Sequence, residues 1–340
     1  MIFLVLLTII VSTLSWYLVK LLIAYLHDKQ IVDTPNERTL HQGDVPRGGG
    51  LAIIFLTSLA IIFIGILSGR ISMFLALLIC VLAWASLSWL DDRHGLSPRS
   101  RFLVQIIYAL FMLLAFGWVE QIQLTSKYYL LIPKLGFLLS LLGVVWLANL
   151  YNFMDGMDGL AASQAIVASA TLSFWLWQYG DQGLAIVCLV LAAGSYGFLI
   201  WNWHPAKIFM GDVGSVTIGA FFATMILIGV SRYDMPVISF VILLSVFIFD
   251  ASITILRRLF KREKIWLPHR SHYYQRLAKM GFSHSKIVIT LIVIMTLSSL
   301  IASITLAYRD SIGIAILLEL VLLFSCIIIV EVLDSNKRIR

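Results

Sequence analysis

The sequence predicts an all-α membrane protein whose chain crosses the bilayer about eleven times. Of its 340 residues, 60% are hydrophobic and only 13% are charged, whereas soluble domains are about half apolar and about a quarter charged. The apolar residues fall in long Leu- and Ile-rich runs, without the alternation of a membrane β-barrel. Backbone groups in lipid must be satisfied within one segment, so we expect these runs to be helices.

Each expected span is an apolar run close to the roughly 20 residues that a bilayer core requires. The first run is preceded by no basic segment and is longer than a signal-peptide core, so we expect it to be a retained span. We expect one membrane domain, residues 1–340, with a small surface hairpin in 120–133. The expected spans are 2–26, 51–68, 72–90, 102–118, 136–152, 160–178, 183–201, 214–230, 236–256, 287–308 and 311–333.

Lys and Arg are divided unequally between the two sets of loops. The loops after odd-numbered spans, together with the C-terminal tail, hold 19 of them, and the other loops hold 5. Because basic residues favour the cytoplasmic side, the sequence predicts an N-terminus outside and a C-terminus inside the cell. The net charge of +7 is accounted for by this topology, and we expect no nucleic-acid partner.

Five dense polar clusters all follow odd-numbered spans. A transporter that works by alternating access would more often place such residues near the midplane of the bilayer. Gathered at one face, they predict a site open to the cytoplasm at the boundary of water and lipid. The clusters are "DTPNERTLHQGDVPRGGG", "WLDDRHGLSPRSR", "NFMDGMDG", "WNWHPAKIFMGDVGS" and "RRLFKREKIWLPHRSHYYQRLAKMGF".

Two of these clusters carry paired acidic residues. The adjacent Asp91 and Asp92 would point about 100° apart on a helix, so that one can face a metal ion and the other a nucleophile. A solvated helix end is the alternative. Asn152, Asp155 and Asp158 recur at intervals that align them on one face of a helix or tight turn. The alternative there is a solvated loop that caps the next span.

Two further aspartates stand at the ends of expected spans. Asp212 lies between two glycines where the eighth span begins, a position suited to a metal ligand and equally to a helix N-cap. Asp250 lies inside the cytoplasmic end of the ninth span. A carboxylate at such a depth is a functional candidate, and the alternative is an ion pair with Arg257 or another helix of the bundle.

Basic groups and imidazoles accompany these acids. Lys binds phosphate as a point charge and Arg as a bidentate fork, and the glycine-rich turn "PRGGGL" is typical of an anion cradle. The basic residues in 257–264 are instead typical of contacts with anionic lipid headgroups. The predicted substrate-binding residues are Arg47, Asn152, Asn202, His204, Lys207, His269, Arg270 and His272.

These residues together predict phosphoryl transfer. Carboxylates favour a hard divalent cation such as Mg²⁺, which can polarise a phosphoryl oxygen. The three cysteines lie inside apolar runs and no Cys/His set has the spacing of a zinc site. No P-loop motif is present.

Four long motifs resemble those of the polyprenyl-phosphate N-acetylhexosamine-1-phosphate transferases, the glycosyltransferase 4 family, relatives of the phospho-MurNAc-pentapeptide translocase. The resemblance implies ten or eleven helices in the bacterial inner membrane, a periplasmic N-terminus and cytoplasmic catalytic loops. It implies transfer of a sugar-1-phosphate from a UDP-N-acetylhexosamine to undecaprenyl phosphate, with release of UMP, with Mg²⁺ or Mn²⁺, and in relatives commonly as a homodimer. The motifs are "DTPNERTLHQGDVPRGGGL", "WLDDRHGLSPRSRFLVQ", "NLYNFMDGMDGLAA" and "WNWHPAKIFMGDVGSVTIGA".

The resemblance also implies roles for individual residues. Asp91 resembles the base that deprotonates the lipid phosphate, and Asp92 a residue that supports the metal ion or that phosphate. Asp212 resembles the principal metal ligand. Asp155 and Asp158 are similar to catalytic-site residues that contact the nucleotide and diphosphate, with Asn152 beside them. A one-step in-line transfer and a two-step route through an aspartyl-phosphate on Asp91 both remain open.

The fifth cluster departs from the translocase pattern, which has three consecutive histidines. In "LPHRSHYYQRL" His269 and His272 are separated, and the segment resembles the branch that starts O-antigen chains, including members that accept 6-deoxy sugars such as FucNAc or QuiNAc. The alternatives are a GlcNAc-1-phosphate transferase that starts enterobacterial common antigen or teichoic acid, a secondary transporter, and a scaffold for an envelope complex.

Overall fold

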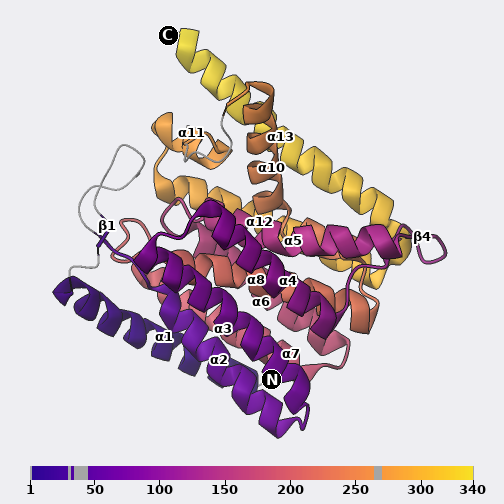
Figure 1. Ribbon diagram of the computed structural model, residues 1–340. Helices are drawn as coiled ribbons and strands as arrows, with labels where there is room; N and C mark the ends of the chain where they lie inside the picture. The colour runs from indigo at the N-terminus through magenta and orange to yellow at the C-terminus, as the bar shows by residue number, and fades with distance from the viewer. Residues whose placement is uncertain (1, 30–31, 34–44, 264–269, 340) are drawn as a thin grey trace.

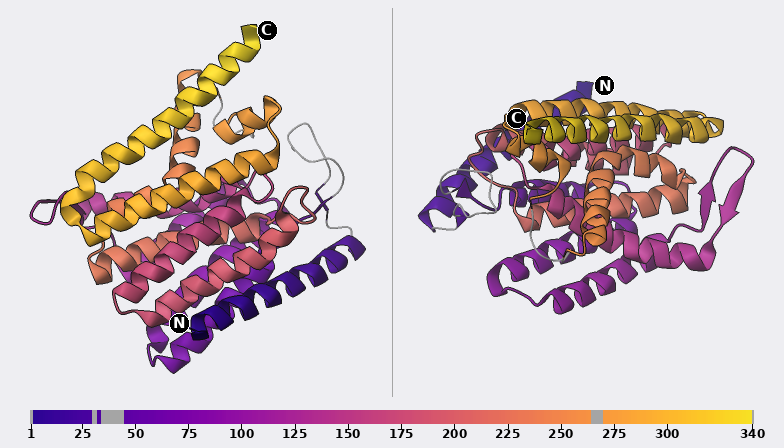
Figure 2. Two further views of the ribbon diagram at one scale, coloured as in Figure 1. Left: turned by 180° about the vertical axis from the view of Figure 1, so that it is seen from behind. Right: turned by 90° about the horizontal axis from the view of Figure 1, so that it is seen from above.

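The computed structural model describes residues 2–29, 32–33, 45–263 and 270–339, and these are almost entirely helical (Figure 1). Ten helices among them are long and apolar enough to cross a membrane, which confirms the all-α polytopic fold. The ten are α1 (Ile2–Asp28), α2 (Gly50–Leu67), α3 (Ile71–His94), α4 (Pro98–Phe116), α5 (Pro133–Met154), α6 (Leu160–Gln178), α7 (Gln182–Asn202), α8 (Asp212–Tyr233), α12 (His284–Ala307) and α13 (Ile312–Ile339). The long helices run roughly side by side, with α1 at one edge of the bundle and α13 at the other (Figure 2).

The ninth expected span, 236–256, is a broken helix, which the sequence did not reveal. It is divided into α9 (Val237–Leu243) and α10 (Ser245–Phe260), which meet at an angle of 78°. Ser245, the first residue of α10, donates a hydrogen bond of 2.6 Å to the buried carboxylate of Glu319 on α13. Ser298 on α12 donates to the same oxygen at 2.8 Å. Polar side chains from α12 and α13 therefore lie at the break between α9 and α10.

The short elements lie outside the long helices. The hairpin expected in 120–133 is confirmed, with β3 (Gln121–Gln123) antiparallel to β4 (Tyr129–Leu131). A second antiparallel pair joins β1 (Val32–Asp33) to β2 (Val45–Pro46). The remaining short elements are helix α11 (Tyr273–Lys279) and the 3₁₀ turn η1 (Arg309–Ser311).

Helix α8 lies in the interior and is the most deeply buried of the long helices among the described residues. Its close packing depends on small residues. A Cβ atom on Gly219 would lie 2.7 Å from the carbonyl oxygen of Leu147 on α5, and one on Gly50 would lie 2.3 Å from the Cα of Gly214. Gly50 and Gly214 allow the starts of α2 and α8 to touch, and that contact places the residues that follow β2 beside Asp212.

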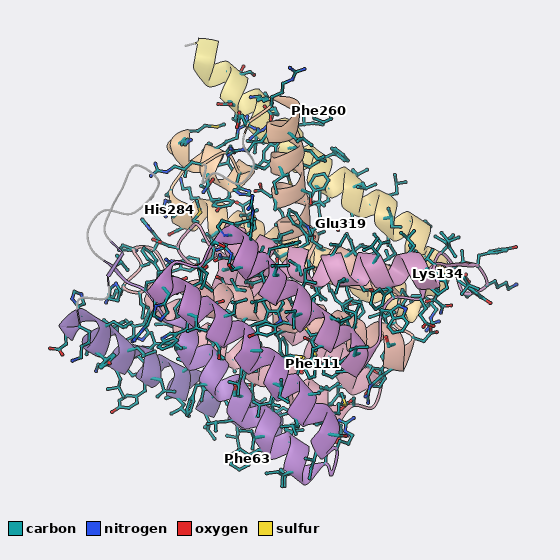
Figure 3. All side chains as sticks on the ribbon, viewed as in Figure 1. Phe63, Phe111, Lys134, Phe260, His284 and Glu319 are labelled. Atoms are coloured by element: carbon teal, nitrogen blue, oxygen red, sulfur yellow. The ribbon has the colours of Figure 1, made fainter. Side chains whose placement is uncertain are left out.

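Large apolar side chains cover the outside of the bundle. Phe63, Leu114 and Ile314, on three different helices, are each more than 60% exposed, and Phe63 is labelled in Figure 3. A soluble monomer rarely shows such extended apolar patches. These surfaces are therefore suited to contact with lipid.

Candidate active site

The site is built where the starts of α2 and α8 meet the ends of α3, α5 and α7. We call this the site end of the bundle. The segment before α2 is held against the segment before α8 by backbone hydrogen bonds, from Gly48 and Gly49 to the carbonyl of Phe209 (3.1 and 2.9 Å) and from Phe209 to the carbonyl of Pro46 (2.8 Å). The polar clusters that follow the first and seventh expected spans are thereby fixed side by side.

Arg47 is the cation at the centre of this end. Its guanidinium contacts the carboxylate of Asp212 at the start of α8 and lies 3.9 Å from that of Asp92 near the end of α3. The Arg47 side chain is 40% exposed and that of Asp212 is 21% exposed. Charges predicted from three separate polar clusters therefore come together in space.

Asp91 lies beside this group but has its own partners. Its carboxylate accepts hydrogen bonds from Arg101 on α4 (2.8 Å) and from the backbone N–H of Leu96 (2.9 Å). These two hydrogen bonds fix the orientation of the Asp91 carboxylate. Asp91 lines a small cavity together with other polar side chains. The polar residues that line this cavity are Ser88, Asp91, Arg101, Gln105, Asn149, Asn152 and Asp212.

Asn152 and Asp155 come from the end of α5. Asn152 accepts a 2.8 Å hydrogen bond from Ser215 on α8. Burial raises the pKa of the Asp155 carboxyl to about 8; the positive charge of Arg47 opposes this shift, and the negative charges of Asp212 and Asp158 add to it. Asp155 is thus within electrostatic reach of the carboxylates that gather around Arg47.

Asp158 forms the second part of the site with two histidines. Its Oδ2 atom lies 2.6 Å from Nδ1 of His204 and 3.7 Å from Nδ1 of His284, and it accepts a 3.2 Å hydrogen bond from the backbone N–H of Ala206. Burial alone would raise the pKa of Asp158, but the contacts with His284, His204 and Ala206 outweigh it and hold this pKa below its usual value. Asp158 is therefore an anion at neutral pH.

Asn202 fixes the loop that carries Asp158. The backbone N–H of Gly159 donates to its Oδ1 atom and its Nδ2 atom donates to the carbonyl of Ile208, both at 2.9 Å. Gly159 adopts φ +79°, a left-handed conformation that other residues rarely adopt. Asn202 therefore joins the loop after α5 to the segment before α8, and direct contact between Asn202 and a substrate stays a prediction.

The remaining predicted residues in the described part of the chain have recorded contacts with other groups. The amino group of Lys207 lies 5.1 Å from the centre of the Trp201 ring. His272 pairs with Asp250 at 3.1 Å, and the carbonyl of Arg270 accepts a 2.8 Å hydrogen bond from Lys279. His269 lies outside the described residues.

Sequence reasoning missed two side chains of the site, Arg101 and His284. Arg101 entered only the count of basic residues, although its place in the "DDRHGLSPRSR" cluster was a signal that it could pair with an aspartate. His284 begins α12 and is 126 positions from Asp158 along the chain. Its contact with Asp158 depends on tertiary packing, which no local motif reveals.

The residues present fit a divalent cation. Asp92, Asp155 and Asp212 supply the oxygen ligands that Mg²⁺ prefers, and all three interact electrostatically with Arg47. A second group, Asp158, His204 and His284, has ligand atoms within 4.8 Å of one another. Its two imidazoles suit transition metals better than Mg²⁺, so the carboxylate group is the better match for Mg²⁺.

Comparison with known proteins connects this geometry to a family. A model of glycosyl transferase family 4 matches residues 73–230, which include Asp91, Asp155 and Asp212. The chain is 31% identical over 275 residues to a probable undecaprenyl-phosphate N-acetylglucosaminyl 1-phosphate transferase of Bacillus subtilis, covering 77% of this chain and 74% of that protein.

Two other relatives match over a comparable share. A decaprenyl-phosphate N-acetylglucosaminephosphotransferase of Mycobacterium leprae is 30% identical over 76% of this chain and 73% of its own length. A phospho-N-acetylmuramoyl-pentapeptide-transferase of Nitratiruptor is 32% identical over 79% of this chain and 82% of its own length. These matches confirm the family that the four motifs predict: the chain belongs to glycosyl transferase family 4.

Proposed function

We propose that this protein transfers an N-acetylhexosamine-1-phosphate from a UDP-sugar to undecaprenyl phosphate, releases UMP and leaves an undecaprenyl-diphosphate-sugar. The observation that carries the proposal is the group of carboxylates from α3, α5 and α8 around Arg47. The names of the relatives describe transfers of the same kind, to undecaprenyl or decaprenyl phosphate.

In the proposed reaction, an oxygen of the lipid phosphate attacks the β-phosphorus of the UDP-sugar. A new phosphorus–oxygen bond forms in line with the bond to UMP, which breaks and leaves its electron pair on UMP. Asp91, oriented by Arg101 and the N–H of Leu96, would take the proton of the lipid phosphate. Catalysis of this type depends on positioning and electrostatics.

Asp212, with Asp92, would hold Mg²⁺ or Mn²⁺, and the ion would neutralise charge that develops on the diphosphate. Arg47 contributes a fixed positive charge at the same place. Asp158, with its histidine partners, supplies hydrogen-bonding groups at the edge of the site, where we place the nucleotide. This assignment agrees with the position of Asp155 and Asp158 on one short loop.

We place the protein in the bacterial inner membrane with the site end toward the cytoplasm. The support is the distribution of Lys and Arg, 19 against 5. In this orientation the nucleotide donor arrives from the cytoplasm and the lipid acceptor arrives laterally. Reaction at the boundary explains why carboxylates stand at the ends of membrane helices, where an unpaired charge is costly.

UDP-GlcNAc is the first donor to test, because two relatives with about 30% identity are named for N-acetylglucosamine. The 6-deoxy donors UDP-FucNAc and UDP-QuiNAc are the second, because of the separated histidines in "LPHRSHYYQRL". A preference for one of these 6-deoxy donors would indicate that the product starts an O-antigen chain.

The test is to incubate the purified protein with undecaprenyl phosphate, Mg²⁺ and each of the three donors in parallel, and to measure UMP and lipid-linked sugar. We expect UMP release that requires the lipid, with one donor preferred. A protein that instead moved a solute across proteoliposomes, without releasing UMP, would be a transporter and would contradict the proposal.

A further inference from the structure

We infer that Asp250 is a positioning residue that holds the 153–159 loop in its substrate-binding shape, acting through the first turn of α11. The inference rests on the proposed function, because it assigns the nucleotide to that loop. Asp250 lies on α10 and has no place in the transfer step itself.

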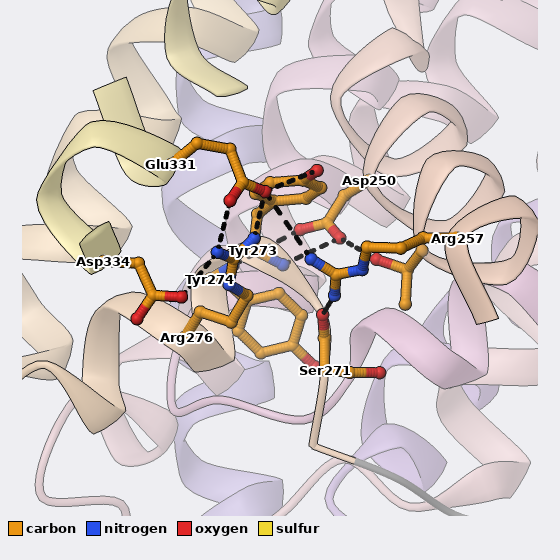
Figure 4. Close-up of polar contacts among 9 residues, drawn as sticks. Asp250, Arg257, Ser271, Tyr273, Tyr274, Arg276, Glu331 and Asp334 are labelled. Carbon is orange, nitrogen blue, oxygen red and sulfur yellow. Dashed lines mark hydrogen bonds and ion pairs between the residues drawn. The ribbon is translucent and has the colours of Figure 1, made fainter. Parts of the chain in front are cut away.

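The carboxylate of Asp250 binds the start of another helix. It accepts hydrogen bonds from the backbone N–H groups of Tyr273 (3.1 Å) and Tyr274 (3.4 Å) (Figure 4). It also lies 3.1 Å from Nδ1 of His272. The side chain of Asp250 is only 13% exposed. The N–H groups at the start of a helix have no partner within it, so a carboxylate from a neighbouring helix fixes both the place and the direction of α11.

The first turn of α11 is in direct contact with the 153–159 loop. The hydroxyl of the buried Tyr274 donates a 3.4 Å hydrogen bond to the carbonyl of Phe153. A Cβ atom on Gly156 would lie 2.3 Å from that hydroxyl and 3.3 Å from Nε2 of Gln275. The part of the loop on either side of Asp155 therefore packs against α11.

The same segment reaches the loop a second time. Helix α12 starts at His284, five residues after the end of α11, and His284 contacts Asp158. Movement of α11 would therefore disturb both ends of the loop. The other end of α11 is tied independently, since Arg276 pairs with Glu331 (2.5 Å) and Asp334 (2.8 Å) on α13 (Figure 4).

This arrangement gives a specific expectation for Asp250→Asn. The amide is similar in shape but is uncharged and presents an NH₂ group, so it can no longer satisfy all three α11 groups. Arg276 still holds the helix, so the change is a local shift of the loop. Small displacements of a binding group cost up to about 100-fold. We expect the KM for the UDP-sugar to rise by about 10-fold or more, with a smaller fall in kcat.

The test compares the full-length protein with variants of the proposed path and with controls. Asp250→Asn removes the charge, Asp250→Glu restores it, and Tyr274→Phe removes only the hydrogen bond to Phe153. Thr254→Val is the matched control, because it removes the hydrogen bond that this carboxylate receives from within α10 and leaves those from Tyr273 and Tyr274 in place. Asp181→Asn controls for loss of another buried carboxylate, one that pairs with Arg70 at the end of α7 opposite the site.

We expect Asp250→Asn and Tyr274→Phe to raise the KM for the UDP-sugar while the KM for undecaprenyl phosphate stays within about twofold, and Asp250→Glu to recover part of the loss. Both controls should keep the KM of the unchanged protein. Hydrogen exchange, which needs no turnover, should show faster exchange of the 153–159 backbone in Asp250→Asn. An unchanged exchange rate and an unchanged donor KM, or an equal effect in Asp181→Asn, would overturn the inference. Absence of UMP release from the unchanged protein would instead overturn the proposed function.

Discussion

Arg47 shows how one residue can organise a site of excess negative charge. Asp212 is close enough to repel both Asp92 and Asp155, and the guanidinium of Arg47 offsets part of that repulsion. Like charges held together in this way are unfavourable without a cation. The site is therefore prepared to bind positive charge and, with it, a diphosphate.

Asp212→Asn is expected to lower kcat by about 100-fold or more, since the loss of one electrostatic contact at a reacting centre typically has an effect of this size. The reason is that the amide neither forms an ion pair with Arg47 nor holds a divalent cation. Steady-state UMP release in detergent measures it. The matched control is Asp234→Asn, an exposed aspartate that pairs with Arg309 away from the site, which should keep normal turnover. Near-normal kcat in Asp212→Asn would remove this residue from the metal site.

The raised pKa of Asp155 predicts a pH dependence of stability in protein treated with EDTA. The folded pKa of about 8 exceeds the unfolded value of about 4, so the folded state binds the proton more tightly. The resulting stabilisation is complete below about pH 4 and is lost as the pH rises through about 8. The apparent Tm should therefore fall between pH 5 and pH 9.

Two further measurements separate Asp155 from other titrating groups. Asp155→Asn should flatten this dependence, because the amide does not titrate. Added Mn²⁺ should raise the apparent Tm most at high pH, where the carboxylates are ionised. A dependence on pH that is the same in the variant would assign the effect to other residues.

At the scale of elements, the break between α9 and α10 is the feature that places Asp250 and α11. The bend of 78° turns α10 out of the line of α9, and the carboxylate of Glu319 lies where the two helices meet. Apolar side chains can pack against either course of the chain. The polar contact to Ser245 and Ser298 is specific to the bent one.

Glu319→Ala should lower the apparent Tm by a few degrees, because it removes two hydrogen bonds between helices, each worth about 0.6 to 1.7 kcal/mol in a membrane. Ser245→Ala should have a smaller effect. The two changes together should be less than additive, since they share one contact. Thr296→Val, whose hydroxyl bonds only to its own helix at Ile292, is the control and should not change Tm. Full additivity would show that Glu319 and Ser245 act independently.

The helices and the polar clusters could be predicted from the sequence because both are encoded locally. Long apolar runs specify helices in lipid, and the "YYLLI" strand signal specifies the hairpin. The break at Ser245 could not be predicted, because "VISFVILLSVFIFD" contains no proline or glycine. Its polar partners, Glu319 and Ser298, are distant in the sequence. His284 was missed for the same reason, whereas Asp92, Asp155 and Asp212 were found because each stands in its own motif at the end of a helix.

At the scale of the whole molecule, the positive-inside rule and the position of the site make one prediction about orientation. In a background in which Cys80, Cys188 and Cys326 are replaced, Ser126→Cys in the β3–β4 hairpin should react with a membrane-impermeant maleimide on intact cells. Ser100→Cys at the start of α4, near Asp91, should react only after the membrane is opened. The reverse pattern would place the carboxylates outside the cytoplasm and would exclude a cytoplasmic nucleotide donor.

In the proposed reaction the sugar and its phosphate move together onto a lipid. The most direct measurement uses UDP-GlcNAc with tritium in the sugar and a radiolabelled β-phosphate, given to the purified protein with undecaprenyl phosphate and Mg²⁺. We predict both labels in the lipid phase in equal molar amounts, and UMP in the aqueous phase. Tritium in the lipid without the β-phosphate would show glycosyl transfer with release of UDP, and would contradict the proposed reaction.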